Sequence, residues 1–200
     1  YHGANRLGAN SLVSAIYGGM VAGPKAVEYI KGLKKSSQDI SSSVFDSFHK
    51  KQTDKYESLL AMSGTENAYV IHKELGEWMT ANMTVVRHNP KLEATIGKIK
   101  ELKERYRKIN MNDASRWNNQ GVAFTRQLWN MLELSEAMTL GALMRNESRG
   151  AHYKPEFPNR NDEEFLKTTK AAWTAEGPQI SYDEVDVSLI PPRVRDYSKD

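Results

Sequence analysis

Apolar residues recur at helical spacing along most of this chain. Between Asn10 and about Leu33 they fall three or four positions apart, which predicts an amphipathic helix. Pro24 lies inside this stretch, and its missing N–H is expected to kink the helix or to restart it. A polar, Ser-rich linker follows over 34–43, and a weaker helical pattern covers about 45–62.

Two stronger amphipathic patterns come next, separated by a short connection. The first, over 63–87, opens with Ser63 three residues before Glu66, which is the spacing of a capping box. The second opens with Asn89 as a helix cap and Pro90 at the first helical position. Its near-heptad stripe consists of Leu92, Ile96, Ile99, Leu102 and Tyr106.

A third pattern is the longest of the set. Asn112 or Asp113 is expected to cap this helix, because both side chains accept hydrogen bonds from free backbone N–H groups. Its stripe keeps alternating spacings of four and three through Trp117, Gly121, Phe124, Leu128, Met131, Ser135, Met138 and Ala142. Three such helices joined by short turns predict an up-down bundle.

The character of the chain changes after about Asn146, where prolines interrupt the periodicity. Acidic residues at 162–164 suit the first turn of a short helix, which we expect over 161–172. The alternation over 180–190 is sufficient for one or two short strands. The predicted fold class is mainly α: an N-terminal helix, a three-helix up-down bundle and a short extended or β C-terminal tail.

Composition narrows the classes of function. The 200 residues include no cysteine, which excludes disulfides, thiolate catalysis and Cys-ligated metal centres. The net charge of +3 is too weak to indicate a nucleic-acid partner. A basic run over 98–108 is interleaved with Glu101 and Glu104, as expected for a solvated helix face. The most apolar stretch, 12–27, is too short and too interrupted to span a bilayer.

Two segments carry candidate chemistry. Residues 1–12, YHGANRLGANSL, form a Gly-containing loop that runs into a helix, and Arg6 offers a planar fork for a carboxylate or phosphate near the first-turn N–H groups. The alternative is an ordinary capped helix with a surface arginine. The segment NESRGAH at 146–152 is interpreted by its spacing as a helix stop, with Gly150 left-handed and Arg149 near the last carbonyls.

The chain lacks the common catalytic motifs. It has no dinucleotide-binding or phosphate-binding glycine motif, no zinc-protease motif and no nucleophile elbow. His49 and His88 have no partner at metal-ligand spacing. We therefore assign no catalytic residue and no metal ligand.

Three segments together resemble one family. HGANRLGANSL at 2–12 resembles the final FAD-domain motif of the succinate dehydrogenase and fumarate reductase flavoproteins. NESRGAHYKPEFPNRNDEEFLKTT at 146–169 and DEVDVSLIPPRVRDYS at 183–198 resemble the family's C-terminal signature and closing segment. The order is the expected one, and the resemblance covers the whole chain and looks closest to succinate dehydrogenases of Bacillus-like bacteria.

The resemblance implies a domain organisation. Residues 1–44 would be the C-terminal edge of an FAD-binding domain, 45–145 a spectrin-repeat-like bundle of three helices, and 146–200 a C-terminal extension. It also implies site residues: Arg6 would bind a carboxylate of the dicarboxylate substrate, and Ser11 and Leu12 would contact FAD. A helix N-terminus there would stabilise the charge that a reduced flavin carries.

The resemblance further implies partners and a location. The intact enzyme would be a succinate:quinone oxidoreductase that oxidises succinate to fumarate, with an iron–sulfur subunit as its direct partner and a membrane cytochrome b anchor as an indirect one. It would lie peripherally on the cytoplasmic face of the bacterial membrane.

The remaining alternatives concern the extent and the direction of this function. Because the chain begins at Tyr1 inside a motif, we expect it to be a piece of a longer polypeptide that alone neither holds FAD nor turns over substrate. A fragment of a related fumarate reductase or L-aspartate oxidase is one alternative. A helical interaction module without catalytic activity is another.

Overall fold

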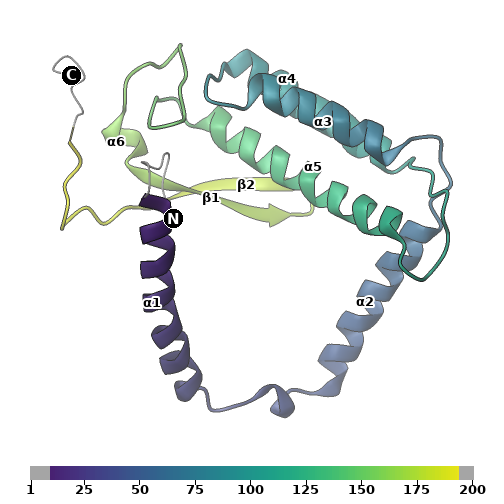
Figure 1. Ribbon diagram of the computed structural model, residues 1–200. Coiled ribbons are helices and arrows are strands. Elements are labelled where there is room, and N and C mark those ends of the chain that lie inside the picture. Colours follow the sequence, from purple (N-terminus) through teal and green to yellow (C-terminus); the bar gives the residue numbers. More distant parts are fainter. Residues whose placement is uncertain (1–9, 194–200) are drawn as a thin grey trace. The chain divides into compact units, whose positions relative to one another are not determined.

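The computed structural model describes residues 10–193 and is mainly helical (Figure 1). The predicted fold class is confirmed. In chain order the elements are α1 Asn10–Gly32, the 3-10 helix η1 Ser37–Asp39, α2 Ser42–Leu60, α3 Ala68–Asn82, α4 Asn89–Tyr106, α5 Gln120–Met144, α6 Asp162–Phe165, β1 Lys167–Thr174 and β2 Gly177–Glu184. Among the described residues there are two compact units, the first over 10–76 and 100–131 and the second over 77–99 and 132–193.

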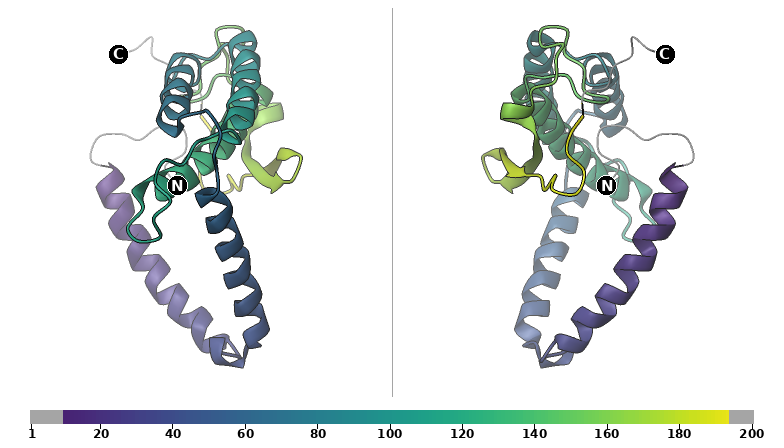
Figure 2. Two further views of the ribbon diagram at one scale, coloured as in Figure 1. Left: turned by 90° about the vertical axis from the view of Figure 1, so that its right-hand side faces the viewer. Right: turned by 90° about the vertical axis from the view of Figure 1, so that its left-hand side faces the viewer.

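The two N-terminal helices are long and carry exposed apolar side chains. The helix α1 continues through Pro24 without interruption, so the predicted restart was wrong (Figure 2). The apolar residues Leu12, Ile16 and Met20 on α1 are largely exposed. Within the described residues, no helix is long and apolar enough to cross a membrane.

The start of α3 differs from the capping box predicted at Ser63. Asn67 performs the capping, since its Oδ1 accepts a hydrogen bond from the backbone N–H of Tyr69 at 2.8 Å. Ser63 instead forms a β-bridge with Asn110, and the backbone N–H of Glu66 donates to the carbonyl of Lys108 at 2.8 Å. A pairing between distant segments has therefore replaced the local cap.

Parts of three helices pack together in the first unit. Tyr106 at the end of α4 donates from its hydroxyl to the Thr125 carbonyl of α5 at 3.0 Å, and its ring lies 5.0 Å from that of Trp129. On α4, Arg105 forms ion pairs with Glu66 at 3.0 Å and with Glu74 of α3 at 2.8 Å. The basic run thus includes one arginine held within the fold.

The helix α5 begins later than predicted. Its cap is Asn119, whose Oδ1 accepts from the backbone N–H of Val122 at 3.0 Å, so the prediction of Asn112 or Asp113 was wrong. Trp117 lies before the helix and is 89% exposed, so it is not part of the buried stripe. The buried positions of α5 are Val122, Thr125, Leu128, Leu132, Ser135, Glu136, Thr139 and Ala142.

The second unit also brings three helices together. Met83, just after α3, packs with Leu92 of α4 and Ala142 of α5 in a buried apolar cluster. The side chain of Asn82 donates to Thr95 Oγ1 at 3.0 Å, which joins α3 to α4. This core lies beside the end of α5, from which the candidate site extends.

A β-hairpin replaces most of the helix predicted over 161–172. Only α6 forms there, capped by Asn161, whose Oδ1 accepts from the backbone N–H of Glu164 at 3.1 Å. The strand β1 follows and pairs antiparallel with β2, from Lys167 opposite Glu184 to Thr174 opposite Gly177. The predicted strand region was therefore right for 180–184 only, because β2 ends there.

Candidate functional site

The residues predicted to bind substrate and cofactor lie at the start of the chain. Arg6 lies outside the described residues. Ser11 and Leu12 lie in the first turn of α1, and the side chain of Leu12 is 73% exposed. Because the first N–H groups of a helix have no partner within the helix, this turn is a position where an electron-rich group can be held.

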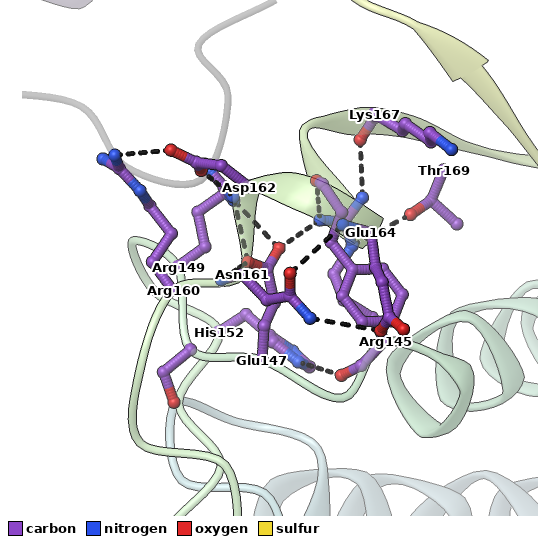
Figure 3. A network of polar contacts seen from close by, with 12 residues as sticks. Arg145, Glu147, Arg149, His152, Arg160, Asn161, Asp162, Glu164, Lys167 and Thr169 are labelled. Atoms are coloured by element: carbon purple, nitrogen blue, oxygen red, sulfur yellow. Dashed lines mark hydrogen bonds and ion pairs between the residues drawn. The ribbon is translucent and has the colours of Figure 1, made fainter. Parts of the chain in front are cut away.

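The second predicted segment centres on a buried carboxylate, that of Glu147, which has no solvent exposure. Arg149 donates to both of its oxygens at 2.9 Å, and Arg145 donates to Oε1 (Figure 3). The backbone N–H of Asn161 donates to Oε2 at 2.9 Å. Burial alone would raise the pKa of Glu147, but these hydrogen bonds hold it below its ordinary value.

The network extends outward through a second carboxylate. Asp162 accepts from Arg149 at 2.7 Å and from Arg160 at 2.6 Å. Its pKa lies below the ordinary value, mainly because Arg149 donates to it. Arg149 therefore joins two acids, one buried and one partly exposed, and so holds α6 next to the segment that follows α5.

Arg145 connects the end of α5 to the hairpin (Figure 3). Besides Glu147, its guanidinium donates to the carbonyls of Phe165 at 2.9 Å and Lys167 at 2.5 Å, and to Thr169 Oγ1 at 3.2 Å. These partners span the junction between α6 and β1. One side chain thus satisfies the backbone where the chain changes from helix to strand.

Gly150 is left-handed as predicted, with a φ of 58°, but it does not end a helix. The helix α5 has already ended at Met144, and Gly150 lies in a tight turn in which Arg149 and His152 exchange backbone hydrogen bonds of 2.8 and 3.1 Å. The prediction for Arg149 was also wrong, because two acids engage its side chain. A fully buried lysine, Lys154, binds the end of α5 instead, donating to the carbonyl of Leu143 at 2.9 Å.

His152 is a buried neutral imidazole. Its Nε2 lies 2.9 Å from the carbonyl oxygen of Arg145 and must be the donor, so Nδ1 accepts from Arg87 at 2.6 Å. Burial lowers the pKa of His152, and the charges of Arg87, Lys154 and Arg145 lower it further. The ring therefore connects two arginines without adding a charge of its own.

Sequence reasoning missed three cations of this region: Arg87, Arg145 and Lys154. A signal existed for Arg145, because Arg145, Glu147 and Arg149 alternate basic, acidic and basic at intervals of two. No comparable signal marks Arg87, which lies 65 positions from the histidine it contacts.

The network is saturated and stabilises the fold. Both oxygens of Glu147 are occupied by donors, and His152 has a partner at each nitrogen. Within residues 10–193, no group of three His, Cys, Asp or Glu side chains is arranged to hold a metal ion. The geometry therefore fits a role in holding α5, α6 and β1 together.

Comparison with known proteins identifies a matching family and several similar proteins. Residues 72–197 match the family described as fumarate reductase flavoprotein C-term. The chain is 64% identical over 200 residues to the succinate dehydrogenase flavoprotein subunit of Bacillus subtilis, covering 99% of this chain and 34% of that protein. It is 34% identical over 197 residues to the fumarate reductase flavoprotein subunit of Haemophilus influenzae, covering 98% and 32%.

A solved protein structure contains a region with a similar fold. A quinol fumarate reductase chain of E. coli matches with a TM-score of 0.87 and 31% identity, covering 96% of this chain and 33% of that one. The chain thus spans about one third of the length of these relatives. The fold, the family match and the identity over nearly the whole of this chain agree. The chain therefore belongs to the fumarate reductase and succinate dehydrogenase flavoprotein C-terminal family.

Proposed function

We propose that this chain is the C-terminal part of the FAD subunit of a succinate:quinone oxidoreductase, which oxidises succinate to fumarate in the intact enzyme. The observation that carries the proposal is the difference in identity: 64% to a succinate dehydrogenase flavoprotein subunit, against 34% to a fumarate reductase flavoprotein subunit, each over nearly the whole chain. The fumarate reductase direction remains the second candidate because that family matches as well.

In this proposal Arg6 binds a carboxylate of succinate. Its planar guanidinium can hold the substrate by two parallel hydrogen bonds and so orient it for reaction. In this proposal the catalytic groups are supplied by the rest of the subunit. Arg6 is therefore a substrate-binding residue, and we assign no catalytic residue within the 200 positions.

Ser11 and Leu12 are proposed to contact FAD. The geometry of α1 fits such a contact, since both residues lie in its first turn and Leu12 is largely exposed. FAD, when bound in the intact subunit, supplies the acceptor for the hydride that succinate loses. The first-turn N–H groups would favour negative charge on the flavin ring.

The isolated chain is proposed to bind no FAD and to turn over no succinate. Mixing purified chain with FAD should give no stoichiometric complex, and a yellow one-to-one complex after gel filtration would contradict the proposal. In the intact enzyme the partners would be an iron–sulfur subunit and, through it, a membrane cytochrome b anchor. The subunit would lie peripherally on the cytoplasmic face of the membrane.

Arg6→Ala in the full-length subunit tests the proposed role directly. Removing one member of a desolvated charge pair should lower kcat/KM for succinate by about 100-fold, or about 3 kcal/mol of transition-state stabilisation. Arg107→Ala is the control, because Arg107 is exposed just after α4 and its ion pair is with the exposed Glu104 three residues before it. Near-normal succinate oxidation by the Arg6→Ala enzyme would exclude the role.

Two further observations separate the alternatives. The coding sequence upstream of Tyr1 should continue in frame, whereas a start codon there would favour a free-standing interaction module. A neighbouring gene for an iron–sulfur subunit would favour the respiratory enzymes over an L-aspartate oxidase.

A further inference from the structure

The second unit contains an open pocket that the proposed function does not use. It has a volume of about 400 Å³, which is within the range of small-molecule sites. Its walls come from the end of α5, from Met83 after α3 and from the inner side of the hairpin. The apolar lining includes Met83, Leu134, Met138, Ala142, Ala171 and Ile180.

Small residues create this space. The pocket is lined by Ala137, Gly141 and Ala142 of α5 and by Ala171 of β1, whose small side chains leave its volume unfilled. Leu134 and Met138 at its edge are 64% and 55% exposed. An apolar surface of this kind is stabilised when an apolar group displaces water from it.

One end of the pocket is polar and is lined by Arg87, Arg145 and His152. Two of these groups are already engaged. Arg145 donates to Glu147 and to the backbone of the α6–β1 junction, and His152 is neutral with both nitrogens paired. The charge available to a ligand is therefore that of Arg87.

Arg87 is partly buried and has no carboxylate partner among the described residues. Its Nε donates to the Thr84 carbonyl at 2.8 Å, Nη1 to His152 at 2.6 Å and Nη2 to the Met83 carbonyl at 3.4 Å. Since each terminal nitrogen carries two hydrogens, one on each is left without an acceptor within residues 10–193. A carboxylate takes two such donors together.

We propose that this pocket binds a small amphipathic monocarboxylate, with its carboxylate on Arg87 and its apolar body between α5 and the hairpin. A single negative charge matches this site, because Arg145 is already paired with Glu147 and His152 is neutral, which leaves Arg87 as the lining cation that has no carboxylate partner among the described residues. The apolar walls select a hydrocarbon body, and the volume limits it to a short chain or one ring.

The test is calorimetric titration of the full 200-residue chain with octanoate. Octanoate should bind at one site, and Arg87→Gln should weaken its binding at least about tenfold, because a charge-assisted hydrogen-bond pair is lost. Arg107→Gln, which removes an exposed guanidinium that is not among the residues lining the pocket, should leave the affinity unchanged. Octanamide, which has the same body without the charge, should bind at least about tenfold more weakly than octanoate.

A second variant keeps the proposal testable if Arg87→Gln does not fold. Ala137→Phe keeps Arg87 but fills the pocket, and it should also weaken octanoate binding at least about tenfold. Circular dichroism establishes that each variant retains its helices. Absent octanoate binding, equal binding by octanamide, or unchanged affinity in a folded Arg87→Gln or Ala137→Phe variant would each overturn the proposal.

Discussion

The carboxylate of Glu147 is buried, and hydrogen bonds from the protein replace those that it would form with water. Burying a carboxylate is costly, and the attraction of its partners compensates only when the geometry satisfies its oxygens. Here Arg145, Arg149 and the Asn161 backbone N–H supply that geometry. Loss of Glu147 would leave Arg145 partly buried without a carboxylate partner among the described residues, whereas Arg149 would keep Asp162.

Glu147→Gln should therefore destabilise the chain strongly. We expect a loss of about 3 kcal/mol in the free energy of unfolding, since two guanidinium groups would lose their common anion. Urea unfolding followed by circular dichroism measures it. Glu104→Gln, at an exposed pair with Arg107, is the matched control and should change stability little. Equal effects of the two substitutions would show that the buried network contributes nothing special.

At the scale of elements, the start of α3 and the segment after α4 are fitted closely to each other. The N–H of Gly64 donates to the Ile109 carbonyl at 3.1 Å, and the N–H of Met111 donates to the Met62 carbonyl at 2.8 Å. A Cβ at position 64 would lie only 1.9 Å from the carbonyl oxygen of Lys108. Only glycine permits the two backbones to approach this closely.

Gly64→Ala should break this pairing at a cost of about 3 kcal/mol, because the clash is with backbone, which cannot rotate away. Gly97→Ala is the control, since a Cβ at that exposed position of α4 meets nothing within 4 Å. It should stabilise the chain by about 0.5–1 kcal/mol through helix propensity. Thermal unfolding of both variants measures the two effects, and a Gly64→Ala protein as stable as the parent would contradict the packing argument.

Sequence reasoning identified the long helices because their signals are local. Stripes such as Leu92, Ile99 and Leu102 repeat within one element, and these residues are buried as the spacing requires. The strand β1 was missed for the opposite reason. The segment 167–174 contains Lys and Ala, which favour helix, but pairing with 177–184 and the contact of Arg145 with the Lys167 carbonyl decide its conformation.

The site shows the same division between local and distant information. The order of residues in 146–152 pointed to a left-handed Gly150, and φ at Gly150 agrees. The contact of Arg149 with Asp162 could not be foreseen, because Asp162 is brought to it by the turn and by α6. Ser63 was likewise expected to cap a helix, yet a bridge to Asn110 determines its place.

At the scale of the whole molecule, two buried groups predict how stability depends on pH. Burial lowers the pKa of Lys154 to about 8, below its value of about 10.4 in an unfolded chain. Burial raises the pKa of Tyr106 to about 12, above its unfolded value of about 10. Each unit thus contributes a group whose proton affinity in the alkaline range changes on folding.

The signs follow from proton counting. Between pH 8 and 10 the unfolded chain keeps the Lys154 proton and the folded chain releases it, so Lys154 should raise stability by about 2 kcal/mol over this interval. Above about pH 10 the unfolded chain loses the Tyr106 proton first, so stability should fall again. Urea unfolding at pH 8, 9, 10 and 11 should show the maximum. In Lys154→Met the rise should vanish, and a rise that persists there would assign it to other groups.

The contacts of Arg145 also determine which residues can replace it. Four acceptors surround its guanidinium: Glu147, the carbonyls of Phe165 and Lys167, and Thr169 Oγ1. Lysine has the same charge, but its three hydrogens are fewer than these acceptors and radiate from one point, whereas guanidinium donors lie spread in a plane. Position 145 therefore requires the shape of arginine more than its charge, and the usual interchange of basic residues does not apply there.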